Sequence, residues 1–136
     1  MNAALLRSGL DYWRERSDFL LIEGAGGLLS PITEHEYAVD LALDLGFPLL
    51  VVSANELGTI HSTLATILAA GTFGDSLSMA GVVLNQRNHP PADAACASNF
   101  DELSARCGLK ILGQVGWGSQ SIDREVDWFE IAGARA

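Results

Sequence analysis

The sequence is poor in cysteine and in basic residues, and each shortage narrows the class of protein. Only two cysteines occur, Cys96 and Cys107, and their spacing fits no metal-ligand pattern, so we expect idle thiols in a reducing compartment. Eight basic residues stand against 17 acidic ones, which gives a formal net charge of -9. This imbalance argues against non-specific binding to nucleic acid or to an anionic membrane surface.

Long apolar runs and targeting signals are also missing. No run approaches the roughly 20 residues that a membrane-spanning helix needs. Residues 1–13 show no basic region followed by an apolar core and a cleavage site, so we expect no signal peptide. We therefore expect a cytoplasmic protein. With 49% hydrophobic and 18% charged residues, the composition is that of an ordinary globular chain rather than a disordered one.

Continuous apolar runs alternate with stretches of helical spacing along the chain. The expected strands are residues 19–23, 47–55, 79–86 and 109–115. The expected helices are residues 5–16, 35–46, 59–71 and 93–107. This alternation predicts an α/β fold, with a parallel sheet covered by helices on both faces. We found no repeat and no linker, and we expect one domain over residues 1–136.

Polar residues and glycines follow the end of each expected strand. They lie at residues 23–27, 53–58, 85–86 and 116–118. In open parallel sheets, ligands bind at the carboxyl ends of the strands, where such segments meet at one edge. The pattern therefore predicts a ligand site at that edge.

Glu23 is the first candidate for a specific role. A carboxylate at the tip of a buried strand is costly unless it pairs with a base or holds a cation, and Mg²⁺ prefers such hard oxygen ligands. Gly24, Ala25 and Gly26 carry almost no side chain, so their backbone can approach a phosphate closely. The alternative is a strand end paired with a basic side chain and followed by a flexible turn. The residues alone leave both interpretations open.

The start of the helix expected at 59–71 is the second candidate. Free N–H groups after Gly58 favour an anion such as a carboxylate, whereas Thr59 could instead be an ordinary helix cap. His61 is interpreted as a surface residue. Asn85 offers a donor and an acceptor to the edge of a nucleobase, although asparagine is also a common turn residue. Trp117 is interpreted as a core or lid aromatic.

Four stretches, taken in order, resemble the dethiobiotin synthetase family. They read "LLIEGAGGLLSPIT", "VDLALDLGFPLLVVSANELGTIHSTLAT", "MAGVVLNQ" and "ILGQVGW". The resemblance covers residues 6–117, and "EGAGG" with "SP", followed by "LGTI" after the next strand, is its most specific part. The cobyrinic acid a,c-diamide synthases share the same sheet and some of these features, and they are the second choice.

The resemblance implies a P-loop NTPase-like fold and a ligase of biotin biosynthesis that uses ATP and Mg²⁺. In this family, CO₂ and 7,8-diaminononanoate form a carbamate, and ATP phosphorylates it. The second amine then attacks the mixed anhydride, which closes the ureido ring and releases phosphate. Members are usually homodimers that bind the carboxylate of the diamine at the dimer interface.

The resemblance also implies roles for individual residues. Glu23 matches the metal-binding acid. The backbone beside the phosphates is matched by Gly24, Ala25 and Gly26. The residue that reads adenine is matched by Asn85, with Gln86 beside it, and the base is flanked by Gly116, Trp117 and Gly118. The turn whose amides hold the carboxylate of the diamine is matched by Leu57, Gly58, Thr59 and Ile60.

One departure from the family pattern affects function directly. The phosphate-binding loop Gly-x-x-x-x-Gly-Lys-Thr does not occur in these 136 residues, and neither the catalytic lysine nor the second metal-binding aspartate has a counterpart. We therefore identify no catalytic residue, and we predict negligible synthetase activity for this chain alone. Smaller departures are His61-Ser62, where the family often has Asn-His, and Gly116, where it often has Pro. Asp123 is only loosely spaced for an acid near the ribose.

Three explanations of this departure remain open. The chain is a fragment of a longer protein, one half of a split enzyme whose P-loop half is another chain, or a non-catalytic homologue. As a homologue of this kind, it would serve as a dimerising or nucleotide-binding module. An amidoligase fragment of the second family is a further alternative.

Overall fold

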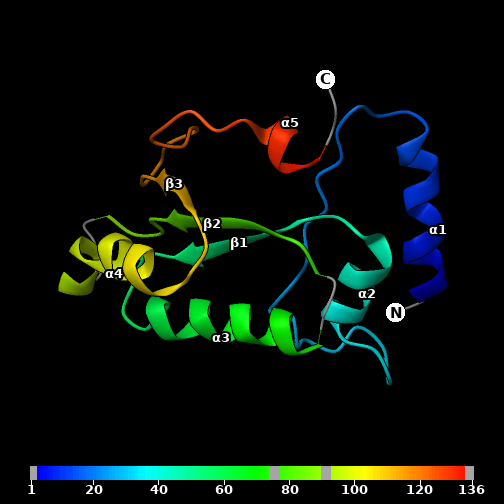
Figure 1. The fold of residues 1–136 in the computed structure, drawn as a ribbon, viewed down its shortest axis with the longest axis horizontal. Helices are drawn as coiled ribbons and strands as arrows, with labels where there is room; N and C mark the ends of the chain where they lie inside the picture. The colour runs from blue at the N-terminus through cyan, green and yellow to red at the C-terminus, as the bar shows by residue number, and fades with distance from the viewer. Residues whose placement is uncertain (1–2, 74–76, 90–92, 134–136) are drawn as a thin grey trace. The chain divides into compact units, whose positions relative to one another are not determined.

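The computed structural model describes residues 3–73, 77–89 and 93–133 (Figure 1). Its elements are α1 (Ala3–Arg14), α2 (Ala38–Leu45), β1 (Leu49–Ala54), α3 (Thr59–Phe73), β2 (Met79–Asn85), the 3₁₀ helix η1 (Ala94–Ala97), α4 (Asn99–Arg106), β3 (Ile111–Val115) and α5 (Trp128–Ile131). The chain divides into two compact units: unit 1 holds residues 1–48, 69–78 and 128–136, and unit 2 holds residues 49–68 and 79–127. The single domain expected from the sequence stays a prediction.

Unit 2 is built on a three-stranded parallel sheet with the strand order β1-β2-β3. Val51 pairs with Val82, which pairs with Ile111, so these buried side chains form a row across the sheet. Leu103 of α4 and Cys107, which follows α4, belong to the same core, and Ile60, Leu64 and Ile67 of α3 pack against it. The structure therefore confirms the predicted α/β class, a parallel sheet flanked by helices.

Most of the predicted elements overlap an observed one with shifted boundaries, and the end of α2 shows which sequence signal locates a boundary well. It ends at Gly46, which adopts the left-handed conformation with φ 68° and donates its N–H to the Ala42 carbonyl. α3 begins at Thr59 as predicted but continues past Gly71 to Phe73. A glycine inside a helix costs only about 1 kcal/mol and does not by itself end it. None of the helices in the described ranges is long and apolar enough to cross a membrane.

The single helix expected at residues 93–107 is wrong, because the structure has η1 and α4 there. Asp93 begins η1, and its carboxylate accepts the N–H of Ala95 at 2.8 Å. At the other end, the N–H and the hydroxyl of Ser98 both donate to the Ala95 carbonyl. Because serine side chains compete for backbone groups in this way, the first turn closes at Ser98 and α4 starts afresh at Asn99.

The strand expected at residues 19–23 is not formed, so the prediction that Glu23 ends a buried strand is wrong. Residues 17–24 contain no helix or strand, and Leu21 is 80% exposed. A strand exists only through hydrogen bonds to a neighbouring strand. An apolar run shows that a segment can be buried, but it does not show that a neighbour is available.

The tail after Trp117, for which no element was predicted, is tied to β3. Asp123 donates its N–H to the Gln114 carbonyl at 2.9 Å, and its carboxylate accepts the Gln114 N–H at 2.8 Å. Gly113 makes this approach possible, because a Cβ there would collide with Ile122 and Asp123. The short helix α5 was also not predicted and belongs to unit 1.

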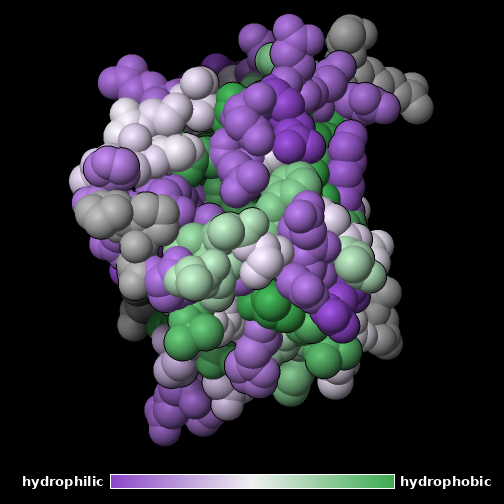
Figure 2. All heavy atoms as spheres, turned by 90° about the vertical axis from the view of Figure 1, so that its left-hand side faces the viewer, coloured by the Kyte–Doolittle hydropathy of each residue, from purple (hydrophilic) through white to green (hydrophobic). Residues whose placement is uncertain are grey.

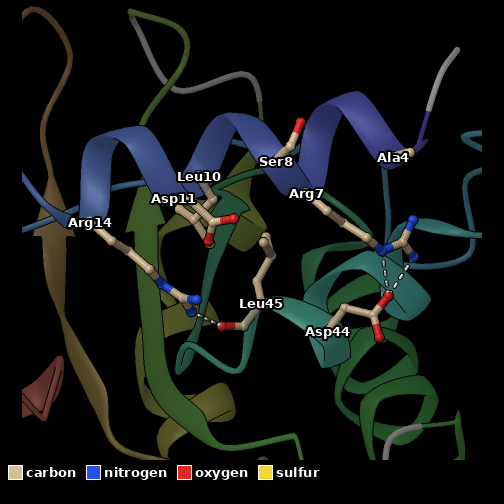
Figure 3. A pocket seen from close by; sticks show the side chains of 8 residues that line it. All are labelled: Ala4, Arg7, Ser8, Leu10, Asp11, Arg14, Asp44 and Leu45. Atoms are coloured by element: carbon tan, nitrogen blue, oxygen red, sulfur yellow. Dashed lines mark hydrogen bonds and ion pairs between the residues drawn. The ribbon is translucent and has the colours of Figure 1, made fainter.

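In unit 1, Arg7 joins α1 to α2 (Figure 3), and it also joins α1 to the loop before α2. Its guanidinium bonds Asp44 of α2 and Glu36 of the loop, and these two carboxylates, Asp44 first, raise the pKa of Arg7 above its ordinary value. A cavity of about 410 Å³ between α1 and α2 is lined by Ala4, Arg7, Ser8, Leu10, Asp11, Arg14, Asp44 and Leu45. Both arginines that line it are engaged by the protein, since Arg14 donates to the Leu45 carbonyl at 2.9 Å.

Candidate functional site

The carboxyl ends of the three strands lie at one edge of the sheet in unit 2, on the left in Figure 1. Ala54 at the end of β1 pairs with Asn85, and Asn85 pairs with Val115 at the end of β3. Figure 2 looks toward this side and shows hydrophilic and hydrophobic side chains interspersed over it. Three of the four predicted strand ends therefore meet, as the sequence indicated.

Two buried asparagines organise this edge. Asn99, the first residue of α4, donates its amide to Asn55 Oδ1 at 2.9 Å and to the Glu56 carbonyl at 3.2 Å. Asn55, which follows β1, donates its own amide to Gln86 Oε1 at 3.0 Å and to the Cys96 carbonyl at 3.2 Å. Because both ends of the Asn55 amide are paired, its burial is compensated.

Sequence reasoning missed this pair. Asn55 lies inside the strand end "SANELG", where the sequence predicts no role for it, and Asn99 lies inside the single helix that the sequence predicts at residues 93–107. The available signal was an asparagine directly after an apolar strand. Nothing in the spacing of 44 positions between the two asparagines indicates that they meet.

The turn from Leu57 to Ile60 is present, but two of its four amides are already engaged. Leu57 donates its N–H to Asp93 Oδ2 at 2.8 Å, and Thr59 donates its N–H to the Glu56 carbonyl at 3.2 Å. Gly58 has φ 93°, which favours glycine at this position. The amides of Gly58 and Ile60 have no hydrogen-bond partner among the described residues. An internal carboxylate, that of Asp93, thus occupies one of the amides assigned to a ligand.

Thr59 is the most informative side chain of this turn. It is 3% exposed, and its hydroxyl has no hydrogen-bond partner in the described part of the chain, so the interpretation as an ordinary helix cap is wrong. One turn later, the equally buried Thr63 hydroxyl is paired with Ser53 Oγ at 2.7 Å. An unpaired buried hydroxyl costs about 1–3 kcal/mol. His61, by contrast, is exposed, as expected.

Asn85 and Gln86 differ in whether their side-chain amides already form hydrogen bonds within the protein. The Asn85 carbonyl accepts the Asn55 N–H at 2.8 Å, whereas its side-chain amide has no partner among the residues described. Gln86 is engaged at both ends of its amide, because it accepts from Asn55 and donates to the Asn88 carbonyl at 2.9 Å. The open amide of Asn85 can contact a ligand without breaking an existing bond.

Residues 116–118 form an exposed turn after β3, closed by the Ser119 N–H donating to the Gly116 carbonyl at 3.0 Å. Trp117 is 59% exposed, so its interpretation as a core residue is wrong, while a lid role stays a prediction. Asp123, loosely considered for the ribose, is engaged elsewhere. Arg124 and the Gln114 N–H hold the pKa of Asp123 below its ordinary value.

The glycine-rich loop in unit 1 is built differently. Glu23 is exposed and has neither a hydrogen-bond partner nor an ion-pair partner within the described ranges, so the expected alternative of a basic partner is not found. Gly26 has φ 83°, and a Cβ there would collide with Ser30 Oγ, which accepts the Gly27 N–H at 2.9 Å. A Cβ at Gly24 would meet no atom within 4 Å. The convergence of this loop with the edge in unit 2 stays a prediction.

The fit of this loop to Mg²⁺ rests on a single carboxylate. Among the described residues there is no group of three or more His, Cys, Asp or Glu side chains that could hold a metal ion. Mg²⁺ is often held by one or two carboxylates, with waters and substrate phosphates as its other ligands. The exposed Glu23 carboxylate fits that arrangement.

Comparison with known proteins identifies the class first. A protein-family model described as an AAA domain matches residues 4–124, which is most of the chain. The chain therefore belongs to this family, whose members have the P-loop NTPase-like α/β fold. Within it, the chain is of the dethiobiotin synthetase type, which confirms the resemblance seen in the sequence.

Individual relatives support this narrower assignment. The chain is 36% identical over 120 residues to the ATP-dependent dethiobiotin synthetase BioD of Rhodopirellula baltica, covering 81% of this chain and 46% of that protein. It is 37% identical over 116 residues to the protein of the same name from Anaeromyxobacter dehalogenans strain 2CP-1, covering 85% and 51%. With that of Methanococcus aeolicus, identity is 35% over 112 residues, covering 81% and 51%. The chain spans about half the length of the curated relatives it matches.

Proposed function

We propose that this chain carries the adenine-binding and diamine-binding part of a dethiobiotin synthetase. The whole reaction would be the ATP- and Mg²⁺-dependent closure of the ureido ring from 7,8-diaminononanoate and CO₂. The observation that carries the proposal is the buried hydroxyl of Thr59, which has no partner among the described residues and lies in the turn where the family resemblance expects a ligand carboxylate. A carboxylate accepting from this hydroxyl would remove the cost of leaving it unpaired.

The substrate carboxylate would be held by the Thr59 hydroxyl together with the N–H groups of Gly58 and Ile60. These two amides lie at the start of α3, where the helix dipole also favours negative charge. The Leu57 amide is the fourth candidate, and it becomes available only if Asp93 releases it. Asp93 therefore competes with the substrate for one hydrogen bond of the turn.

The nucleotide would be read at the ends of β2 and β3. The open side-chain amide of Asn85 supplies a donor and an acceptor for the adenine edge, with Gln86 beside it held in place by Asn55. Gly116, Trp117 and Gly118 would flank the base, and the exposed indole of Trp117 offers a surface for stacking.

Glu23 would hold Mg²⁺ through one carboxylate oxygen, and Gly24, Ala25 and Gly26 would leave room for the phosphates. The bound ion would neutralise negative charge on those phosphates. Of the three small residues, Gly24 is the one with open space where a side chain would begin. Gly26 is required by its own turn, whether or not a phosphate binds.

Activity of the isolated chain is proposed to be negligible. The P-loop lysine and its backbone cradle supply most of the positioning in phosphoryl transfer, and the motif is absent from these 136 residues. We propose that the chain acts in the cytoplasm as a homodimer or with a second, P-loop-bearing chain. Dethiobiotin formed by the purified chain from ATP, the diamine and CO₂ would contradict the proposed inactivity.

Calorimetric titration tests the two halves of the site separately. The first titration uses ATP with and without Mg²⁺, on the wild type, Glu23→Ala and the control Glu34→Ala, which removes another exposed acid of unit 1. We expect Mg²⁺-dependent binding that weakens only in Glu23→Ala. Binding that is equal in all three proteins contradicts the role of Glu23, and absence of binding contradicts the nucleotide site.

The second titration uses 7,8-diaminononanoate on the wild type, Thr59→Val and Thr59→Ser. Removing the hydroxyl should weaken binding by about tenfold or more, because a hydrogen bond to a charged group contributes about 1.5–3 kcal/mol. Serine retains the hydroxyl and should restore most of the affinity. Equal affinity of the valine and serine variants would exclude the Thr59 hydroxyl as a ligand of the carboxylate.

A further inference from the structure

We propose that Asn55 and Asn99 are positioning residues that couple nucleotide binding to carboxylate binding. They would transmit the ordering of residues 85–86 at the end of β2 to the turn at residues 57–60, so that each ligand strengthens the binding of the other. This inference rests on the proposed function. It concerns two residues to which neither the sequence patterns nor the family resemblance assigned a role.

The first step is a series of side-chain amides in which each amide donates a hydrogen bond to the next group. Asn99 Nδ2 donates to Asn55 Oδ1, Asn55 Nδ2 donates to Gln86 Oε1, and Gln86 Nε2 donates to the Asn88 carbonyl. Hydrogen bonds arranged in series polarise one another, so removal of one member affects the rest. This series of hydrogen bonds connects the first turn of α4 to the end of β2 through Asn55, which follows β1.

The second step is that backbone carbonyls fix this direction. Asn99 Nδ2 also faces the Glu56 carbonyl, and Asn55 Nδ2 also faces the Cys96 carbonyl. A carbonyl can only accept, so neither asparagine can turn its amide over without placing oxygen against oxygen. Asn55 is 8% exposed and Asn99 is 2% exposed, which leaves little access for water as a substitute partner.

The third step is that this series of hydrogen bonds reaches both segments proposed to bind ligands. The backbone of Asn55 donates its N–H to the Asn85 carbonyl at 2.8 Å, so Asn55 contacts both residues at the end of β2. On the other side, the Glu56 carbonyl that Asn99 holds also accepts the Thr59 N–H at 3.2 Å. A base seated against Asn85 and a carboxylate seated at Thr59 therefore order the same hydrogen-bonded unit.

The expected consequence is positive coupling. When two ligands order one unit, the second to bind loses less conformational freedom, and its affinity rises. Coupling between sites typically changes affinity about 5–150-fold, and it is reciprocal. We expect ATP with Mg²⁺ to tighten binding of 7,8-diaminononanoate by at least about fivefold, and the diamine to tighten ATP binding equally.

The test is a binding cycle on the full chain. The dissociation constant of each ligand is measured with and without saturating amounts of the other, in the wild type, Asn99→Asp and the control Gln120→Glu. Asn99→Asp keeps the size of the side chain but replaces the donor that faces Asn55 Oδ1 and the Glu56 carbonyl. Gln120→Glu makes the same amide-to-acid change on an exposed side chain of unit 2. We expect the coupling factor to fall to about one in Asn99→Asp only.

The outcomes separate this inference from the proposed function. If the wild type binds both ligands without mutual effect, or if Asn99→Asp keeps the full coupling factor, the inference is overturned and the proposed function stands. If the wild type binds neither ligand, both are overturned. Should Asn99→Asp fail to fold, NMR of the wild type decides: saturation with ATP and Mg²⁺ must shift the backbone amides of Glu56 and Thr59, and unmoved signals overturn the coupling.

Discussion

The turn after β1 and the glycine-rich loop of unit 1 are both candidates for ligand binding, but the protein holds them very differently. The turn is fixed by the side chains of Asn99 and Asp93, which are distant in the sequence but belong to the same unit 2. The loop is closed by a local turn, in which the Ser30 hydroxyl accepts the Gly27 N–H and the Ser30 N–H donates to the Gly27 carbonyl, and Glu23 before it is exposed. The turn after β1 is restrained by internal hydrogen bonds without a ligand, whereas the Glu23 carboxylate has no partner in the part of the chain that the structure describes.

This difference indicates which of the two candidate binding regions depends on its ligands to become ordered. A turn that internal hydrogen bonds already restrain has less conformational freedom to lose on binding than a segment without them, although its ligands can still order it further. An unattached carboxylate must be ordered by the ion and the phosphates that it helps to hold. The diamine and adenine sites proposed for unit 2 should therefore persist in the isolated chain, while the Mg²⁺ and phosphate site proposed for unit 1 should form only with its ligands present.

The largest effect on stability should come from removing the buried side chain of Asn99, which holds the turn after β1. In Asn99→Ala, Asn55 Oδ1 is left unpaired, while the Glu56 carbonyl keeps its bond from Thr59. We expect a loss of about 2–3 kcal/mol in the free energy of unfolding, measured by urea denaturation. The control Gln120→Ala, on an exposed side chain, should stay within about 0.5 kcal/mol. A loss in Asn99→Ala no greater than in the control would show that the turn is not held by this amide.

A second, smaller effect should differ in sign between two threonines of the same helix. Thr63→Val leaves the buried Ser53 hydroxyl unpaired and should cost about 1–2 kcal/mol. Thr59→Val removes a hydroxyl without a partner in the described ranges and should stabilise the free chain by about 1 kcal/mol. Thermal unfolding of the two variants in parallel measures the difference. Equal destabilisation by both would mean that the Thr59 hydroxyl is already satisfied in the free protein, and its proposed role would lose its basis.

Sequence patterns predicted the part of the fold that depends on local order. Apolar runs located β1, β2 and β3, and Gly46 located the end of α2. The strand predicted around Leu21 failed because pairing depends on a neighbour, which an apolar run does not specify. The break at Ser98 was missed because serine and asparagine side chains bond the backbone in ways that periodicity does not register.

The candidate site was predictable to a similar extent. Strand ends identified Asn85 and the turn after β1, because the carboxyl ends of parallel strands meet at one edge. The Asn55–Asn99 contact could not be predicted, since it joins two elements through side-chain rotamers that only the packed core sets. The capture of the Leu57 amide by Asp93 is of the same kind. Charge and spacing indicate where ligands bind, but not which groups the protein has already used.

Within the loop itself, two glycines should respond differently to alanine. Gly26→Ala should cost about 1–1.5 kcal/mol, because φ 83° is unfavourable for alanine and the new Cβ would displace the Ser30 hydroxyl. Gly24→Ala meets no atom within 4 Å and should stay within about 0.5 kcal/mol. Chemical denaturation measures both. If Gly24→Ala is neutral for stability yet weakens Mg²⁺-dependent ATP binding, Gly24 serves the phosphates, and equal ATP affinity would assign it no such role.

The smallest effect should be the pH dependence of the tail that Asp123 ties to β3. Arg124 first, and then the Gln114 N–H, hold the pKa of Asp123 below its ordinary value, so its contribution to stability is complete above the unfolded pKa and is lost as the pH falls through the folded pKa. Because Asp123 is exposed, solvent screening should keep this contribution below about 0.5 kcal/mol. The NMR signal of the Gln114 amide should therefore titrate below the ordinary Asp range in the wild type and not in Asp123→Asn, while Asp18→Asn, an exposed control, should leave the titration unchanged. A Gln114 amide that titrates identically in Asp123→Asn would mean that a group other than the Asp123 carboxylate anchors the tail to β3. The Asp123 carboxylate would then not restrain the turn at residues 116–118.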